Sequence, residues 1–325
     1  MGQPPTVTVA VCTRNRPQLL RELVASLYAS GGRSPSWVQT VVVDQSTNDA
    51  SYEVLRNCPL WRDEGRLYIR MNAKGLSRAR NEAVKSALGE VVVFVDDDVR
   101  VPPRFAEEIA AHFDAHPELA AMFAPVEVDL EVWQAHQDGT IPSFTPAQEC
   151  VVDRPDPSAP TGIGANFAMR RSIAEAFPFD EFLGAGSTFH SWEEIDVTQR
   201  LSAAGHAYGV FLYPAVIHTG IRTGRNVRRW VAATECGRGA AVAKQARLGL
   251  RSYSDVWLRH PVRVLSRSLV NMAHTGRPRG LGRIAHYYGG ALRSLRYAVD
   301  RERGTFSRRR RLGMPRPLRA LRRER

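Results

Sequence analysis

The sequence has no apolar run near the roughly 20 residues that a membrane-spanning helix needs. Its first residues, 1–6, do not form a basic, apolar leader, so we expect a cytoplasmic protein. The four cysteines form no CxxC pair, which favours reduced thiols over a disulfide framework. No segment recurs at a fixed period, and this excludes a solenoid.

Acidic residues are scarce at the end of the chain. Residues 301–325 contain eleven arginines and two acidic residues, which is +9 of the total charge of +12. The first interpretation is a solvated, disordered tail. The second is contact with an anionic membrane surface, where each basic residue contributes ~1 kcal/mol. Nucleic-acid binding ranks third, because Phe306 is the one aromatic residue there that could stack on a base.

The rest of the chain has the composition of a globular protein. Of its 325 residues, 43% are hydrophobic and 24% are charged, which is enough to bury a core. Apolar strands alternate with helical patterns over the first hundred residues, and this predicts an α/β fold with a mostly parallel sheet flanked by helices. We expect three parts: an α/β domain over 1–222, a helical extension over 223–300 and the Arg-rich tail over 301–325.

Three polar clusters follow predicted strands, at Thr13–Arg16, Asp44–Asp49 and Asp96–Asp98. Ligands of open parallel sheets bind outside the carboxyl ends of the strands, so the three clusters predict one shared site. Adjacent carboxylates repel one another and need a compensating cation, and Mg²⁺ or Mn²⁺ with phosphate oxygens would supply one. The alternative for Asp96–Asp98 alone is a solvated acidic turn.

Several segments together resemble one family. They are TVTVAVCTRNRP, VVVDQSTND, NAKGLSRARNEAV, the Asp96–Asp98 motif, GIGANFAMRRSIAEAFPFDEFLG and WEEIDVTQRLSAAG. In order and spacing they resemble the family-2 glycosyltransferases of the GT-A fold, over roughly residues 6–220. The resemblance implies a Rossmann-like GT-A domain and inverting, metal-dependent transfer of a sugar from a nucleotide-diphosphate donor to an acceptor hydroxyl.

The resemblance also implies roles for individual residues of the donor site. Asp44 would accept a hydrogen bond from the nucleobase, and Thr13 and Arg14 would lie along the base and ribose. Arg80 would face the nucleotide or its diphosphate. Asp96 and Asp98 match the two aspartates of the metal motif, and Asp97 lies between them in the donor site. Gln45 and Ser46 replace the more frequent acidic-Gly pair after Asp44, which leaves the identity of the base open.

Two later residues each allow two interpretations. Glu194 matches the position of the general base, where Asp is more usual, but its spacing from Ser191 also fits a capping box that closes a helix. His218 follows an apolar run and is either a further metal ligand or a structural histidine.

The resemblance leaves the partners broad. It implies a UDP-, dTDP- or GDP-linked sugar donor and a glycan, lipid-linked or small-molecule acceptor. If the Arg-rich tail binds a membrane, the protein would lie at the inner membrane face. A non-catalytic sugar-nucleotide-binding protein is one alternative. A sugar-nucleotide nucleotidyltransferase is another, but it needs a Gly-rich phosphate loop where this chain has CTRNRP.

Overall fold

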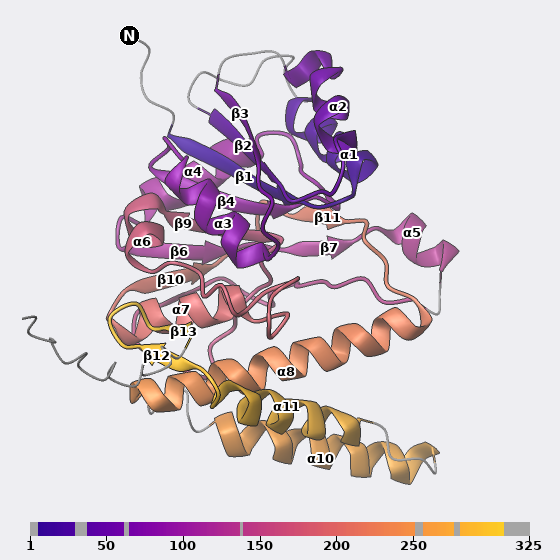
Figure 1. The fold of residues 1–325 in the computed structure, drawn as a ribbon, viewed down its shortest axis with the longest axis vertical. Helices are drawn as coiled ribbons and strands as arrows, with labels where there is room; N and C mark the ends of the chain where they lie inside the picture. Colours follow the sequence, from indigo (N-terminus) through magenta and orange to yellow (C-terminus); the bar gives the residue numbers. More distant parts are fainter. Residues whose placement is uncertain are drawn as a thin grey trace, which may run out of the picture.

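The computed structural model describes residues 6–29, 38–61, 65–136, 139–250, 256–275 and 280–308. Its centre is an eight-stranded sheet in the order β3-β2-β1-β4-β9-β6-β10-β8 (Figure 1). The strands are β1 (Val7–Thr13), β2 (Val38–Asp44), β3 (Arg66–Arg70), β4 (Val91–Asp96), β6 (Leu119–Phe123), β8 (Cys150–Val152), β9 (Asn166–Arg170) and β10 (Ala207–Val210). Strands β1 to β4 and the β6–β10 pair run parallel, while β8 and β9 are antiparallel to their neighbours. This mixed, mostly parallel sheet confirms the predicted fold class.

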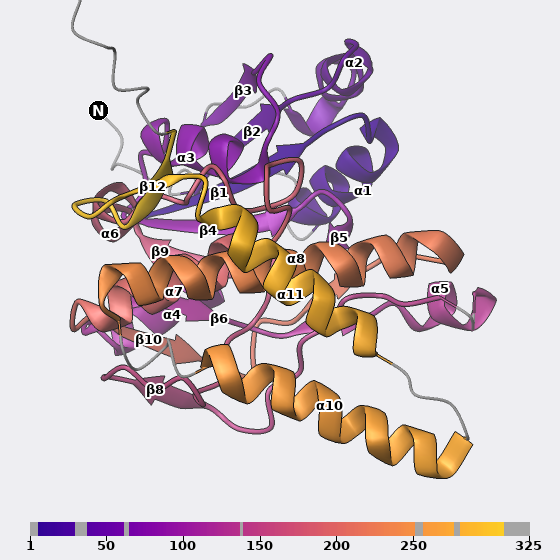
Figure 2. The same cartoon turned by 60° about the horizontal axis from the view of Figure 1, so that its bottom comes forward.

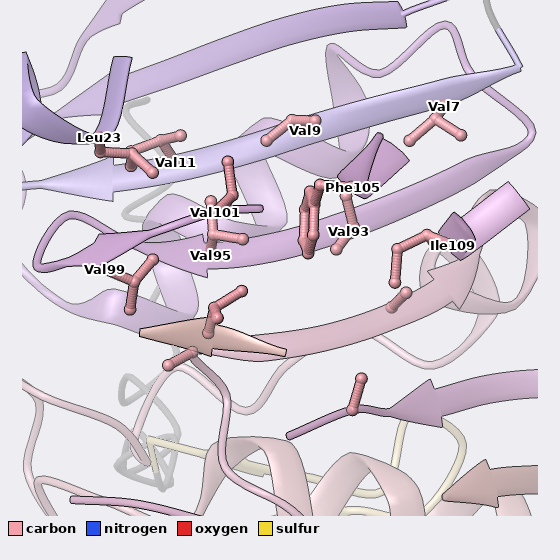
Figure 3. Close-up of a cluster of buried hydrophobic side chains, with 14 of the residues drawn as sticks. Val7, Val9, Val11, Leu23, Val93, Val95, Val99, Val101, Phe105 and Ile109 are labelled. Atoms are coloured by element: carbon pink, nitrogen blue, oxygen red, sulfur yellow. The ribbon is translucent and has the colours of Figure 1, made fainter. Parts of the chain in front are cut away.

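The sheet has helices on both faces because both faces of its central strands are apolar. On one face, Val7, Val9 and Val11 of β1 lie with Val93 and Val95 of β4 (Figure 3). Helices α1 (Pro17–Tyr28) and α4 (Phe105–Ala115) cover this face with their own apolar stripes. The alternate residues of the same strands pack under α3 (Leu76–Lys85), α6 (Arg171–Ala176) and α7 (Glu193–Ala203). Two short helices, α2 (Ala50–Arg56) and η1 (Pro59–Trp61), follow β2.

A small second sheet joins the middle of the chain to the strand that follows the aspartates. It has the order β5-β11-β7, with β5 (Val99–Arg100), β7 (Val126–Val128) and β11 (Val216–His218), and α5 (Leu130–Ala135) follows β7. His218 pairs with Val99 across the antiparallel β5–β11 ladder. This register brings His218 next to Asp98, although 120 residues of sequence separate them.

The C-terminal part is helical, as the sequence predicts. Helices α8 (Gly224–Leu248), α10 (Val256–Thr275) and α11 (Leu281–Ser294) lie below the α/β domain, and α10 lies at the outer edge (Figures 1 and 2). A Cβ atom at Gly239 or Gly290 would overlap the backbone of the facing helix, so these glycines let α8 and α11 pack closely. None of the helices in the described ranges is long and apolar enough to cross a membrane.

A hairpin of β12 (Ala298–Asp300) and β13 (Thr305–Ser307) returns to the α/β domain. Phe306 is buried there among Phe182 and Phe189. The predicted disordered tail over 301–325 therefore begins too early: residues 301–308 are folded because Phe306 fills an aromatic cluster. Residues 309–325, which hold most of the arginines, lie outside the described residues.

A buried ion cluster fastens this extension to the α/β domain. The Nζ atom of Lys244 in α8 lies 2.6 Å from an Asp180 oxygen and 2.8 Å from an Asp196 oxygen. Arg200 donates to the same Asp196 oxygen at 2.9 Å, and the backbone N–H of Phe306 donates to Asp180 at 2.8 Å. Two carboxylates and two cations are thus neutralised inside the protein.

Candidate active site

A cavity of about 300 Å³ opens at the carboxyl ends of β1 and β4. These ends are level, because Thr13 pairs with Asp44 and Cys12 pairs with Asp96. Five residues with a predicted role line this cavity: Thr13, Arg14, Asp96, Asp97 and Asp98. The lining also includes Arg16, Gln45, Lys74, Gly186 and Arg222. Two of the three predicted clusters therefore line one cavity, and the third contributes Gln45.

Asp96, Asp98 and His218 form a cluster suited to a metal ion. One ligand atom from each lies within 4.8 Å of those of the other two. The Nε2 atom of His218 is 3.4 Å from a carboxylate oxygen of Asp98. Burial lowers the pKa of His218, which keeps the imidazole neutral, the form that binds metals. Two carboxylates and one imidazole suit Mn²⁺ or Mg²⁺ that completes its shell with other oxygens.

The backbone around Asp98 is fixed by its neighbours. The N–H and hydroxyl groups of Thr219 donate to the Asp98 carbonyl at 2.9 and 3.0 Å. Gly220 lies directly against the Asp98 side chain, and a Cβ atom there would overlap the carboxylate. The Thr219-Gly220 pair thus sets the position of Asp98 relative to His218.

Arg16 supplies the positive charge that the aspartates need in this structure. Its Nη1 atom lies 2.8 Å from Asp97 and 3.0 Å from Asp98. Thr13 also donates to Asp97, at 2.7 Å. Burial nevertheless raises the pKa of Asp97 to about 6. Asp97 therefore holds the first loop in place, whereas Asp98 faces both Arg16 and His218.

Arg80 lies deeper than the resemblance implies. Its side chain is 2% exposed and does not line the cavity. The guanidinium donates to Glu193 at 2.9 Å, to the carbonyl of Gly164 at 2.9 Å and to Asp96 at 3.3 Å. Its donors thus bind protein groups, and Arg80 connects the metal motif, the GIGAN loop and the start of α7.

Glu194 does not cap helix α7. Trp192, rather than Ser191, is the N-cap residue of this helix. Its backbone is left-handed, with φ 77°, and no side chain donates or accepts a capping hydrogen bond there. The Glu194 carboxylate instead accepts from the backbone N–H of Gly164 at 3.2 Å, and its other oxygen has no partner among the described residues. Burial, with the charge of Glu193, raises the pKa of Glu194 to about 8. A carboxyl group with these properties suits proton transfer near neutral pH.

Asp44 is fully buried and accepts hydrogen bonds within the protein. Tyr68 donates to it at 2.7 Å, the backbone of Ser46 at 2.7 Å and Arg70 at 3.3 Å. Gln45 exchanges two hydrogen bonds with the backbone of Gly75, at 3.1 and 3.2 Å. Of the second cluster, Gln45 lines the cavity and Asp44 does not, so the contact of Asp44 with a nucleobase stays a prediction.

Comparison with protein families adds to this geometry. The family model described as "Glycosyl transferase family 2" matches residues 8–177, more than half of the chain. The chain belongs to this family. The match covers the first strand, the metal motif and the GIGAN segment, so it confirms the resemblance and the glycosyltransferase class.

Solved glycosyltransferase structures share the fold. The Pyrobaculum calidifontis mannosyltransferase PcManGT, solved with GDP-Man and Mn²⁺, has 17% identity and a TM-score of 0.61, covering 91% of this chain and 88% of its own. S. aureus TarS has 19% identity and a TM-score of 0.51, covering 66% of this chain and 37% of its own. A TarS fragment, residues 1–349, has 17% identity and a TM-score of 0.51, with coverage of 95% and 98%. No relative was found among curated protein sequences.

The glycosyltransferase site includes residues that the sequence reasoning missed. Arg16 belongs to the first predicted cluster but has no predicted role, although a basic side chain in a strand-end loop beside three aspartates is a usable signal. Glu193 has no predicted role either, yet it is the ion partner of Arg80. Arg222 lines the cavity through a loop whose return to the site depends on β11, and no local pattern indicates that.

Proposed function

We propose that this glycosyltransferase is inverting and metal-dependent, and that it transfers a sugar from a nucleoside diphosphate donor to an acceptor hydroxyl. The observation that carries the proposal is the cluster of Asp96, Asp98 and His218, whose two aspartates line a cavity together with basic side chains. The presence of GDP-Man and Mn²⁺ in the related PcManGT structure supports it.

In this proposal Asp98, Asp96 and His218 hold Mn²⁺ or Mg²⁺. The ion, when bound, supplies positive charge for the diphosphate leaving group. Arg16 and Arg222 add cationic groups in the cavity lining, where they can bind phosphate oxygens. Thr13 and Arg14, which line the cavity, would lie along the base and ribose of the donor.

Glu194 is the proposed general base. Its carboxylate accepts the proton of the acceptor hydroxyl as that oxygen attacks the anomeric carbon from the face opposite the leaving group. Arg80 acts as a positioning residue, because it holds Asp96 and Glu193, the residue before the base. Transfer in one displacement needs no covalent enzyme intermediate.

A donor screen tests this proposal. The protein is incubated with UDP-, GDP- and dTDP-sugars, with and without Mn²⁺ or Mg²⁺, and released nucleotide is measured. We expect metal-dependent release from one class of donor. Asp98→Asn should reduce release and Mn²⁺ affinity on the order of 100-fold, since changes even behind a ligand cost 10–100-fold. Asp153→Asn, on an exposed side chain, is the matched control.

The screen also separates the rival functions. Binding of UDP, GDP or dTDP with metal but no transfer to any acceptor would favour the non-catalytic scaffold. In a parallel incubation with a nucleoside triphosphate and a sugar phosphate, release of diphosphate would favour the nucleotidyltransferase. Absence of both nucleotide release and calorimetric nucleotide binding would refute the proposed donor site.

A further inference from the structure

The charge of this protein is distributed unevenly before the tail begins. Residues 256–299 contain eight arginines and no Asp or Glu, whereas residues 1–255 carry a net charge of −4. The α10–α11 region is therefore a basic part on an acidic α/β domain. A basic surface of this kind attracts anions.

Helix α10 also exposes more large apolar side chains than any other element of the described chain. Val262, Leu265, Leu269 and Met272 are between 44% and 62% exposed, and their spacing of three and four residues places them on one stripe. Val270, 58% exposed, lies off this stripe, on the side of the helix that carries Arg263 seven residues before it. Scattered exposed apolar residues are ordinary, but a continuous stripe marks a contact surface.

Arginines accompany this stripe. Arg259, Arg263 and Arg267 recur every four residues along α10, and all three are exposed. Arg263 and Arg267 also line a cavity of about 400 Å³ together with Arg238 of α8 and Arg283 of α11. The buried carboxylate of Glu235 accepts from His260 and Arg283, two residues of the cavity lining, at 2.7 Å. Of the four arginines in the lining, Arg238 and Arg283 form ion pairs with Glu235.

We propose that α10 is a membrane-docking helix that binds an anionic phospholipid surface, its apolar stripe in the interface and its arginines against lipid phosphates. An amphipathic helix with a basic polar face and exposed Leu, Val and Met has the composition of an interfacial helix. The position of α10 at the outer edge leaves it accessible (Figures 1 and 2). A second copy of the chain is a poorer occupant, because two basic surfaces repel each other.

Vesicle sedimentation of the full chain tests the proposal independently of transferase activity. The probes are vesicles of phosphatidylcholine alone and of phosphatidylcholine with phosphatidylglycerol. We expect binding to the anionic vesicles that weakens with salt. The double substitution Arg263→Gln/Arg267→Gln should weaken binding roughly 25-fold, about fivefold for each charge. Arg56→Gln/Arg154→Gln, an equal loss of charge at exposed positions of the α/β domain, should leave it within roughly fivefold.

A second pair of variants tests the apolar stripe. Leu265→Gln/Leu269→Gln should reduce vesicle binding by at least roughly tenfold, whereas Leu88→Gln/Leu130→Gln, also exposed, should not. Thermal unfolding checks that all four proteins remain folded. Equal binding to neutral and anionic vesicles would overturn the proposal. So would binding that survives both α10 variants but is lost on deletion of residues 309–325, or α10 variants that change only the association of the protein with itself.

Discussion

Replacement of Lys244 by Met should destabilise the whole protein, because it leaves a buried negative charge. Lys244, Asp180 and Asp196 all have fully buried side chains, and Lys244 contacts both carboxylates. After the substitution, Arg200 still pairs with Asp196, but Asp180 keeps only backbone donors, such as Phe306. Removal of one partner from a buried ion pair costs ~3–5 kcal/mol. That is a large part of the ~5–15 kcal/mol by which a domain is stable.

Equilibrium urea unfolding, followed by tryptophan fluorescence, measures the effect. Lys85→Met is the control, because Lys85 is exposed and forms a surface ion pair with Glu82, so its loss should cost at most ~1 kcal/mol. Adding Asp180→Asn to Lys244→Met removes the uncompensated charge and should reduce the loss to ~1–3 kcal/mol, the cost of a neutral polar group without its partner. A loss for Lys244→Met that equals the Lys85→Met loss would refute the buried cluster.

Other predictions concern the active site and the packing of the extension. Glu194 holds a proton in the folded state between its ordinary pKa of 4.5 and about 8, so stability should fall as pH rises across that window, and Glu194→Gln should flatten the slope measured by urea unfolding. In the unsubstituted protein, the transfer rate should fall as pH drops below about 8, because Glu194 then becomes protonated. An unchanged pH–rate profile in Glu194→Gln would contradict the role of Glu194 as base. Gly220→Ala should push the Asp98 carboxylate aside and weaken Mn²⁺ binding roughly 10-fold or more by electron paramagnetic resonance, and unchanged affinity would argue against the proposed ligand set. Arg80→Lys should lower kcat with little change in the donor KM, since Arg80 does not line the cavity; a raised KM alone would instead indicate direct contact with the donor. Gly239→Ala should cost ~1–3 kcal/mol in thermal or urea unfolding, because its Cβ meets the backbone of α11 rather than a mobile side chain.

The α/β fold was predictable from the sequence because its strands are short, apolar and followed by polar turns. Val91–Asp96 is an example: a buried strand whose last residue begins the metal motif. The same local logic located Asp96 and Asp98. His218 could be suspected but not placed, since its approach to Asp98 depends on pairing between β5 and β11, two strands far apart in sequence.

Two differences have a common physical cause. The resemblance implies that Arg80 faces the donor, and the local spacing allows Ser191 to cap α7. Burial instead directs the Arg80 guanidinium to Glu193, and the left-handed backbone of Trp192 changes the entry into the helix. A sequence shows which groups are polar, but long-range contacts decide which of them pair with each other and which remain for a substrate.

The ion cluster around Lys244 has a consequence for the modularity of this enzyme. The family match ends at residue 177, and the domain boundary predicted from the sequence lies at residue 222. A cut there would separate Lys244 from Asp180 and Asp196, and Phe306 from Asp180. Asp196 lies in α7, the helix that carries Glu194. A chimera that borrows a different acceptor module should therefore keep α8 and the C-terminal hairpin with the catalytic half, and place its junction beyond residue 308.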